Sequence, residues 1–304
     1  MSDPRTLLHA APTLLGAAPF CDAEHAPLRP SRRRWRRATA RAVTLGVLAA
    51  VWVACRPPPN RGLPSQSQSP DHVVAPASVD LGALQLEPGQ SGVSVSVAGQ
   101  GTRELAVWLP AAQGPHPLVI FLHGADGGKW LLGSRGVLDC LVEPALEPIE
   151  PIILAPVSSS RGQWWTEEDI AFVLGLIGAA RQRWSIRSEK PLLLGYSNGG
   201  IGTWFFARQY PDYFSAAIPM ASNDSIVGAT PLPVYAISGD RDELFPIADM
   251  RRAIGAAKAT GQNVTLHEKY RGTHMKACSY VPELEAARDW VTSTVWKTSA
   301  TSTP

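Results

Sequence analysis

The segment 195–200 constrains this chain most, because it places a serine between glycines where the residue pattern changes. It reads Gly-Tyr-Ser-Asn-Gly-Gly, with Ser197 at its centre. The apolar residues 191–194 before it are typical of a buried parallel strand, and residues 200–208 after it have helical periodicity. A strand, a sharp turn and a helix around G-x-S-x-G form a nucleophile elbow, which exposes the serine hydroxyl above the sheet edge.

An elbow serine works with an acid and a histidine that follow it in that order along the chain. Residues 233–237 read as a strand that runs into a turn carrying Asp240 and Asp242. Both aspartates are candidates for the acid, and the one not used would be a surface carboxylate. The turn at the end of this strand is where the acid of such a site belongs.

The histidine should lie in the loop after the last strand. Residues 263–270 alternate like an edge strand. The loop that follows ends in His274, and Gly272 within it permits a tight turn. His274 is therefore the predicted base, whereas His267 lies within the strand and is interpreted as structural.

The three residue types are needed together. A serine hydroxyl is a poor nucleophile at neutral pH, and a neutral imidazole can take its proton and return it to the leaving group. A carboxylate behind the imidazole fixes its tautomer and orientation. Backbone N–H groups must then stabilise the oxyanion, and the first turn of the helix after Ser197 offers one at Asn198.

Together these segments resemble the α/β-hydrolase superfamily, and within it the serine esterases similar to poly(3-hydroxybutyrate) depolymerases, feruloyl esterases and carboxylesterases. The resemblance covers roughly residues 90 to 298. The residues that carry it are Phe121-Leu122-His123-Gly124 and the segments 164–173, 195–200 and 210–217, completed by the acid turn and His274.

The resemblance implies a mostly parallel, doubly wound sheet flanked by helices, and an oxyanion hole made by the N–H groups of Asn198 and Ala125. The turn at 239–246 is similar to the G-x-x-D-x-x-V-P turn of these enzymes, with Phe245 in the Val position, which selects Asp242 over Asp240. Ser238 departs from the pattern, since many relatives carry His there. An alternative for His123-Gly124 is a structural turn.

The chain order supports an α/β fold, because strands alternate with helices and the site of such a sheet lies at the strand C-terminal ends. Besides the elbow, we expect strands at 92–98, 103–109, 117–122, 152–157, 216–221, 233–237 and 263–270. The expected helices lie at 130–141, 166–184, 247–260 and 281–296.

Only residues 222–232 separate two of the expected strands, which is too short for a lid domain. We therefore predict an open site. Its walls would be loops that carry Trp130, Trp164 and Trp165, and we expect the last two to line the substrate groove. The alternative for Trp164 and Trp165 is packing at the start of a helix.

Residues 1–55 differ from the rest of the chain. Arginines cluster around Trp35, and the uncharged apolar run 42–54 follows, ending at Cys55. A basic segment before a short apolar run is typical of an export signal, and this run is too short to span a membrane comfortably. Residues 51–55 also resemble a lipobox, so lipid attachment at Cys55, a secretory signal that is or is not cleaved, and a nonspecific basic leader stay open.

Residues 56–76 have the Pro, Ser and Gln composition of a linker, and 77–304 form the predicted catalytic domain. The predicted location is outside the cytoplasm, as a membrane-anchored lipoprotein or a periplasmic or secreted protein. Of the 28 basic and 26 acidic residues, 8 and 3 lie before residue 56, which leaves 20 and 23 and a net charge of −3. That charge argues against a nucleic-acid partner, because phosphate binding needs a basic surface.

Cys140 and Cys278 lie in the predicted catalytic domain and could form a disulfide in an oxidising compartment, or stay unpaired. No Cys or His spacing suits a metal, and no dinucleotide- or phosphate-binding loop is present in the sequence. We expect a cofactor-free serine esterase acting on a small or polymeric ester. The alternatives are a serine peptidase or acylaminoacyl hydrolase, and a catalytically silent binding protein.

Overall fold

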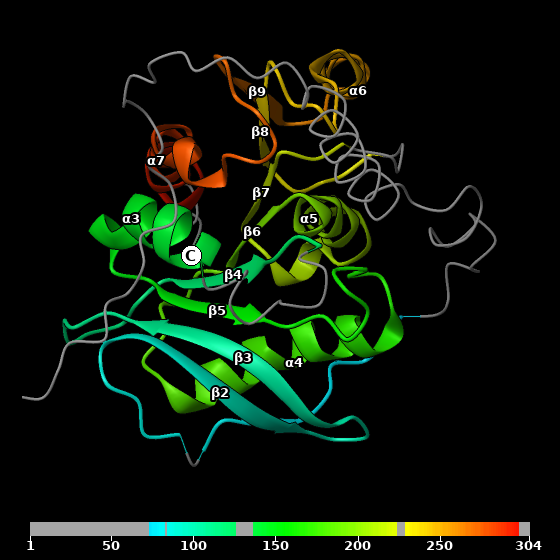
Figure 1. Cartoon of the computed structure of the whole chain (residues 1–304). Coiled ribbons are helices and arrows are strands. Elements are labelled where there is room, and N and C mark those ends of the chain that lie inside the picture. The colour runs from blue at the N-terminus through cyan, green and yellow to red at the C-terminus, as the bar shows by residue number, and fades with distance from the viewer. Residues whose placement is uncertain (1–72, 83, 126–135, 224–228, 298–304) are drawn as a thin grey trace, which may run out of the picture. The chain divides into compact units, whose positions relative to one another are not determined.

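The computed structural model describes residues 73–82, 84–125, 136–223 and 229–297 (Figure 1). These residues form a nine-stranded sheet in the order β1-β2-β3-β5-β4-β6-β7-β8-β9. The predicted leader and nearly all of the predicted linker lie outside the described residues. The strands are β1 Val79–Asp80, β2 Gly89–Val97, β3 Gly101–Leu109, β4 Leu118–Leu122, β5 Ile152–Pro156, β6 Leu192–Tyr196, β7 Ala216–Met220, β8 Val234–Gly239 and β9 Val264–Lys269.

The sheet is antiparallel at one end and parallel elsewhere. Strands β1, β2 and β3 pair antiparallel in sequence, and β3 pairs antiparallel with β5. All pairs from β5 through β4 to β9 are parallel. The predicted mostly parallel α/β sheet is confirmed, and so is the antiparallel opening pair. The two-residue strand β1 was missed, because it is too short to show any periodicity.

The helices follow the predicted alternation with the strands. They are η1 Leu138–Val142, α3 Glu143–Leu146, η2 Glu147–Ile149, α4 Glu167–Arg183, α5 Asn198–Gln209, η3 Pro211–Tyr213, α6 Ile247–Ala259, η4 Ala277–Tyr280, α7 Val281–Trp290 and η5 Val291–Val295. The first part of the helix predicted at 130–141 lies outside the described residues, and the described part is helical in short pieces that run to Ile149. Pro144 and Pro148 lie in the first turns of two of these pieces, where a proline costs no hydrogen bond.

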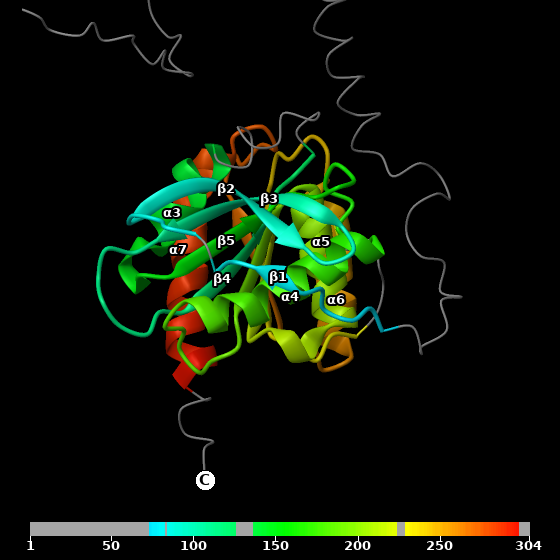
Figure 2. The same ribbon diagram turned by 90° about the horizontal axis from the view of Figure 1, so that it is seen from below.

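Helices cover both faces of the sheet (Figure 2). Helices α4, α5 and α6 pack on one face, and η1, α3 and α7 pack on the other. Along β4, Leu118, Ile120 and Leu122 contribute to the first core cluster and Val119 and Phe121 to the second. Burial on both faces explains why the central strands read as continuous apolar runs in the sequence.

The sheet register brings the chemistry-bearing loops together. Leu122, the last residue of β4, pairs with Gly195 near the end of β6, and Tyr196 pairs with Met220 at the end of β7. The loops after these strands therefore meet at one edge. The connection from β7 to β8 spans residues 221–233, which leaves no room for a lid domain there. Within the described residues, none of the helices combines the length and apolar character needed to cross a membrane.

Candidate active site

Ser197 lies in a strained turn between β6 and α5. Its backbone has φ 59° and ψ −122°, a conformation that a residue with a side chain rarely adopts. Its N–H donates to the carbonyl oxygen of Met220 at 3.0 Å, which ties the turn to the end of β7. Strain of this kind persists only where the surrounding structure enforces it. A strained serine between a strand and a helix is the conformation predicted for the nucleophile elbow.

The glycines of the motif let α5 approach the strand ends closely. A Cβ atom at Gly199 would lie 1.8 Å from the carbonyl oxygen of Leu122, and one at Gly195 would lie 2.2 Å from that of Gly199. A Cβ at Gly200 would lie 2.6 Å from the carbonyl oxygen of Met220. Each contact is shorter than any real side chain allows. The motif is therefore required by the packing of α5 on β4, β6 and β7.

His274 lies between Ser197 and Asp242. Its Nε2 is 2.9 Å from Ser197 Oγ, and its Nδ1 is 3.0 Å from Asp242 Oδ2. The second carboxylate oxygen of Asp242 accepts from the N–H groups of Leu244 at 2.9 Å and Phe245 at 2.8 Å. All three side chains are buried. The predicted nucleophile, base and acid thus form one hydrogen-bonded series.

Asp240, the alternative acid, has a different position. Its backbone N–H donates to the carbonyl oxygen of Lys269 at 3.0 Å, which continues the pairing of β8 with β9. Asp242 comes after the chain has turned away from the sheet, with its N–H donating to Gly239 at 3.3 Å. Of the two aspartates, Asp242 is the one that contacts the imidazole of His274.

The backbone of His274 is held by two side chains that the sequence analysis did not identify. The hydroxyl of Tyr196 donates to the carbonyl oxygen of His274 at 2.6 Å, and the carboxylate of Glu243 accepts from its N–H at 2.9 Å. Burial, together with nearby Tyr280 and Asp242, raises the pKa of Tyr196, so its phenol stays a donor. Tyr196 occupies a variable position of the motif, and no sequence pattern marks it.

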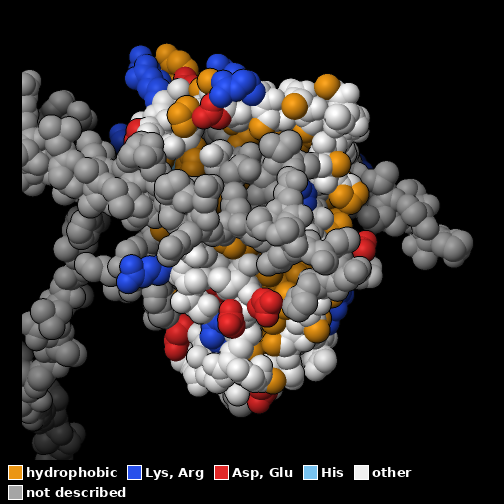
Figure 3. Space-filling view, turned by 90° about the vertical axis from the view of Figure 1, so that its right-hand side faces the viewer, with side chains coloured by type: hydrophobic (Ala, Val, Ile, Leu, Met, Phe, Trp, Pro, Cys, Tyr) orange, Lys and Arg blue, Asp and Glu red, His pale blue; other side chains and the backbone are white. Residues whose placement is uncertain are grey.

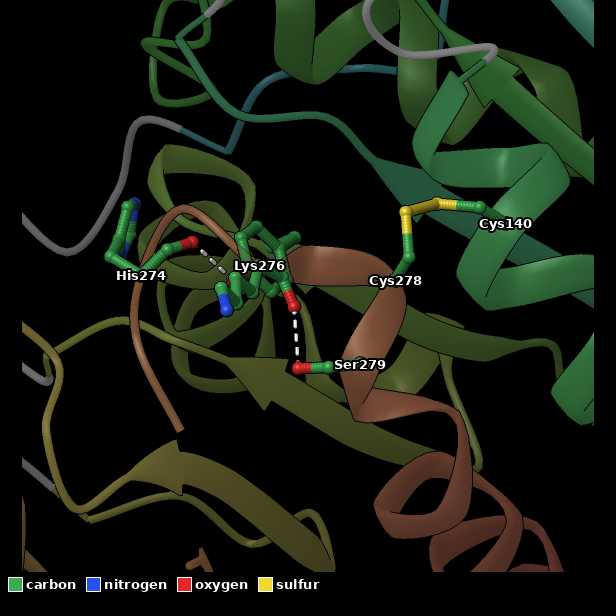
Figure 4. The surroundings of a disulfide bond; sticks show 6 residues. Cys140, His274, Lys276, Cys278 and Ser279 are labelled. Atoms are coloured by element: carbon green, nitrogen blue, oxygen red, sulfur yellow. Dashed lines mark hydrogen bonds between the residues drawn. A yellow bond between two sulfur atoms is a disulfide. The ribbon is translucent and has the colours of Figure 1, made fainter. Parts of the chain in front are cut away.

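A disulfide joins Cys140 of η1 to Cys278 of η4 (Figure 4). Cys278 lies shortly after His274 in the chain, and the bond crosses from this segment to the helical layer formed by η1 and α3. The pairing that the sequence left open is therefore made. It attaches the downstream side of the His274 loop to a distant part of the core.

The loop after β4 lies directly against the elbow. A Cβ atom at Gly124 would be 3.0 Å from Ser197 Cβ and 3.5 Å from Ser197 Oγ. The predicted oxyanion donor Ala125 follows Gly124 and is half-buried. The other predicted donor, Asn198, is the first residue of α5, so its N–H has no acceptor within the helix. The two predicted oxyanion residues thus belong to the two segments that adjoin the Ser197 hydroxyl.

The predicted groove residues have three different outcomes. Trp164 is 0% exposed, and its Nε1–H donates to the carbonyl oxygen of His123 at 3.0 Å. A side chain with no exposed surface cannot line an open groove, so we correct its role to packing behind the loop after β4. Trp165 is half-buried and packs against the first core cluster, the one that α4, α5 and α6 share with the sheet. Trp130 lies outside the described residues.

The surface beside His274 is mixed in character. Tyr270 and Met275, in the loop after β9, are exposed, and Arg271 lies over the Tyr270 ring at 5.2 Å. On the face that Figure 3 turns to the viewer, basic, acidic and hydrophobic side chains lie together at the upper margin of the molecule. The part of the chain that the structure describes holds no group of three His, Cys, Asp or Glu side chains able to bind a metal.

No family model and no curated protein matches this chain. Solved structures do match it. The fluorophosphonate-binding serine hydrolase FphF of Staphylococcus aureus has a TM-score of 0.56 at 16% identity, over 67% of this chain and 98% of that one. An S-formylglutathione hydrolase of the same organism has a TM-score of 0.53 at 15% identity, over 69% and 99%.

A thermostable esterase matches with a TM-score of 0.51 at 21% identity, over 67% of this chain. The match spans 62% of that esterase's own length. At these identities the likeness concerns the fold, and it agrees with the sheet order, the flanking helices and the elbow described above. The chain therefore has the α/β-hydrolase fold.

Proposed function

We propose that this protein is a serine hydrolase that cleaves carboxylic esters through an acyl-enzyme. The observation that carries the proposal is the series from Ser197 Oγ to His274 Nε2 at 2.9 Å and from His274 Nδ1 to Asp242 Oδ2 at 3.0 Å. A serine activated in this way attacks acyl carbons. The solved structures with the same fold include proteins named as esterases and serine hydrolases, which supports the same class for this chain.

In the proposed reaction Ser197 Oγ attacks the ester carbonyl carbon while its proton passes to His274 Nε2. The negative charge on the carbonyl oxygen is stabilised by the N–H groups of Asn198 and Ala125. His274 then gives the proton to the leaving alcohol as the C–O bond breaks. Water attacks the resulting acyl group on Ser197, His274 takes the water proton and returns it to Ser197, and the carboxylic acid is released.

Each role in this reaction has a physical basis in the fold. Asp242 accepts from two backbone N–H groups at one oxygen, which leaves the other directed at His274 Nδ1. That contact keeps the Nδ1–H tautomer, in which Nε2 is free to accept a proton from serine. Side chains and backbone N–H groups supply every step, so the proposed reaction needs no cofactor.

The test compares the full-length protein with Ser197→Ala on a series of p-nitrophenyl esters from acetate to palmitate. Loss of the nucleophile should lower kcat by roughly four to six orders of magnitude. Ser293→Ala, an exposed serine on η5, is the matched control and should retain activity. A fluorophosphonate probe should label the wild type and the control but not Ser197→Ala.

The outcomes separate the candidate functions. Ester turnover that depends on Ser197 supports the proposal, and the chain-length profile then narrows the substrate. Labelling of Ser197 without hydrolysis of any ester would contradict the ester proposal and favour a serine peptidase. Neither labelling nor turnover in the folded protein would favour a silent binding protein with this fold.

We also propose that the protein acts outside the cytoplasm. The disulfide between Cys140 and Cys278 supports this, because such bonds persist in oxidising compartments. The basic and apolar leader that ends at Cys55 is consistent with export. Fractionation of cells that express the wild type and Cys55→Ala, after labelling with a fatty acid, tests the location and the lipid together. Unlabelled protein in the cytoplasm would contradict the proposal.

A further inference from the structure

A buried ion pair lies behind the candidate site, and the proposed reaction does not use it. Asp169, in the first turn of α4, is 0% exposed, and its Oδ1 lies 2.5 Å from the guanidinium of Arg103 on β3, which is 9% exposed. Removing two charges from water is costly, and apolar replacements of similar size are often as stable. Stability alone therefore gives little reason to place this pair in the core.

The ion pair holds the loop that follows β5. Asp169 Oδ2 accepts from the hydroxyls of Ser158 at 2.8 Å and Ser160 at 3.0 Å, and Oδ1 accepts from the N–H of Ser159 at 2.9 Å. Arg103 donates to the carbonyl oxygen of Val157 at 2.6 Å. Every residue from 157 to 160 is thus bonded to one or the other charge, and the loop has little freedom to shift.

That loop in turn fixes His123. The N–H of Ser158 donates to His123 Nε2 at 3.1 Å. Because Nε2 accepts, the ring proton is on Nδ1, which donates to the carbonyl oxygen of Gly124 at 2.7 Å. The hydroxyl of Ser158 also accepts from the N–H of Gly162 at 2.8 Å. A Cβ atom at Gly162 would lie 3.3 Å from Asn198 Cβ and 3.4 Å from the Gly124 carbonyl carbon.

The bond to Gly124 has a direct consequence for the proposed oxyanion hole. The carbonyl of Gly124 and the N–H of Ala125 belong to one planar trans peptide, so they point in opposite directions. When the Gly124 oxygen is held against the His123 ring, the Ala125 N–H is turned away from that ring. The orientation of the His123 side chain thus sets the direction of a proposed oxyanion donor.

We propose that Asp169, paired with Arg103, is a positioning residue for the oxyanion side of the site. It acts through Ser158 and His123 on the peptide between Gly124 and Ala125. This inference rests on the proposed esterase function. It assigns a specific effect on the transition state to a residue in the first turn of α4, because a donor displaced by even part of an ångström stabilises the oxyanion less.

The test measures kcat and KM for p-nitrophenyl acetate in the full-length protein and in Asp169→Asn. Asn keeps the shape of Asp but removes the charge and two of the acceptor positions. We expect kcat to fall by roughly tenfold to a hundredfold with KM changed less than about twofold, because the lost interaction is made in the transition state. Glu268→Gln, which removes the charge from an exposed ion pair with Arg251, is the control and should retain kcat.

A double-mutant cycle separates positioning from a general loss of structure. If Asp169 acts through His123, Asp169→Asn should lower kcat little further in a His123→Ala background. Independent, multiplying losses would overturn the proposal, and so would an unchanged kcat in folded Asp169→Asn. A trifluoromethyl ketone inhibitor should lose affinity in parallel with kcat/KM, because it binds as the tetrahedral adduct.

A further variant keeps the test decisive. Ser158→Ala keeps the ion pair and the bonds of Asp169 to Ser159 and Ser160, and it removes the hydroxyl that joins Asp169 to the residue bonded to His123. It should therefore reproduce the selective fall in kcat even if Asp169→Asn does not fold. Folded Ser158→Ala with wild-type kcat would then overturn the inference. Wild-type protein that hydrolyses no ester would instead refute the proposed function, which Ser197→Ala tests separately.

Discussion

His274 and His123 belong to two of the loops that adjoin Ser197, and the fold uses their rings in different ways. His274 is fixed by its backbone, through Tyr196 and Glu243, and its ring nitrogens contact Ser197 and Asp242. Both ring nitrogens of His123 bond to backbone groups, of Ser158 and Gly124, and its own carbonyl oxygen accepts from Trp164 Nε1–H.

The difference follows from what each side of the site is proposed to do. A ring that takes up and releases a proton must keep one nitrogen available to the reacting groups, so His274 is held by its main chain and by Asp242 at Nδ1, and its Nε2 is left to Ser197. A ring that orients a peptide must keep one tautomer throughout, so both of its nitrogens are used in fixed bonds. The same residue type serves as proposed base on one side and as a structural element on the other.

The largest expected loss of activity comes from a substitution on the His274 side of the site. Asp242→Asn should lower kcat for p-nitrophenyl acetate by roughly ten-thousandfold, because the amide favours the wrong imidazole tautomer. Asp240→Asn is the matched control and should change kcat only slightly, since Asp242 is the aspartate that contacts His274. Steady-state kinetics of both variants show which aspartate is the acid. A dead Asp240→Asn beside an active Asp242→Asn would reverse the assignment.

A smaller loss of activity is expected from a substitution in the loop that carries His123. At Gly124 an added methyl group would lie 3.0 Å from Ser197 Cβ, so the loop must shift by a few tenths of an ångström. Gly124→Ala should therefore lower kcat by about tenfold to a hundredfold, as small misplacements of reacting groups do. Gly255→Ala on α6 meets nothing within 4 Å and should keep full activity. Wild-type kcat in Gly124→Ala would show that this loop does not constrain Ser197.

The smallest loss of activity is expected when the disulfide is removed. The double variant Cys140→Ser, Cys278→Ser should lose about 2–5 kcal/mol of unfolding free energy, because the cross-link closes a long loop. Its kcat at 25 °C should stay within a few-fold of wild type, since Tyr196, Glu243 and Asp242 still hold His274. Denaturant unfolding and kinetics on the same samples measure both quantities. A collapse of kcat in the folded variant would make the disulfide the main support of the His274 side.

Sequence reasoning predicted those parts of the site in which a chemically reactive residue stands within a recognisable local pattern. The elbow was predicted because a G-x-S-x-G motif stands between an apolar run and a helical pattern, and His274 because it ends a loop after an alternating strand. Asp242 was selected by its turn. Arg103 and Asp169 carried no such mark, because one is a polar residue in a strand and the other resembles an ordinary acidic helix start.

The sequence by itself determined the alternation of strands and helices and the elbow, because these depend on periodicity and on the steric demands of glycine over a few residues. Asp242 was chosen by the resemblance of its turn to that of α/β-hydrolases, and His274 by its place after the last expected strand. Tertiary structure alone decided that Trp164 is buried, that Cys140 pairs with Cys278, and that Arg103 meets Asp169. Those contacts join residues far apart in the chain, and their distances depend on how α4, η1 and the sheet pack together. No local pattern encodes that packing.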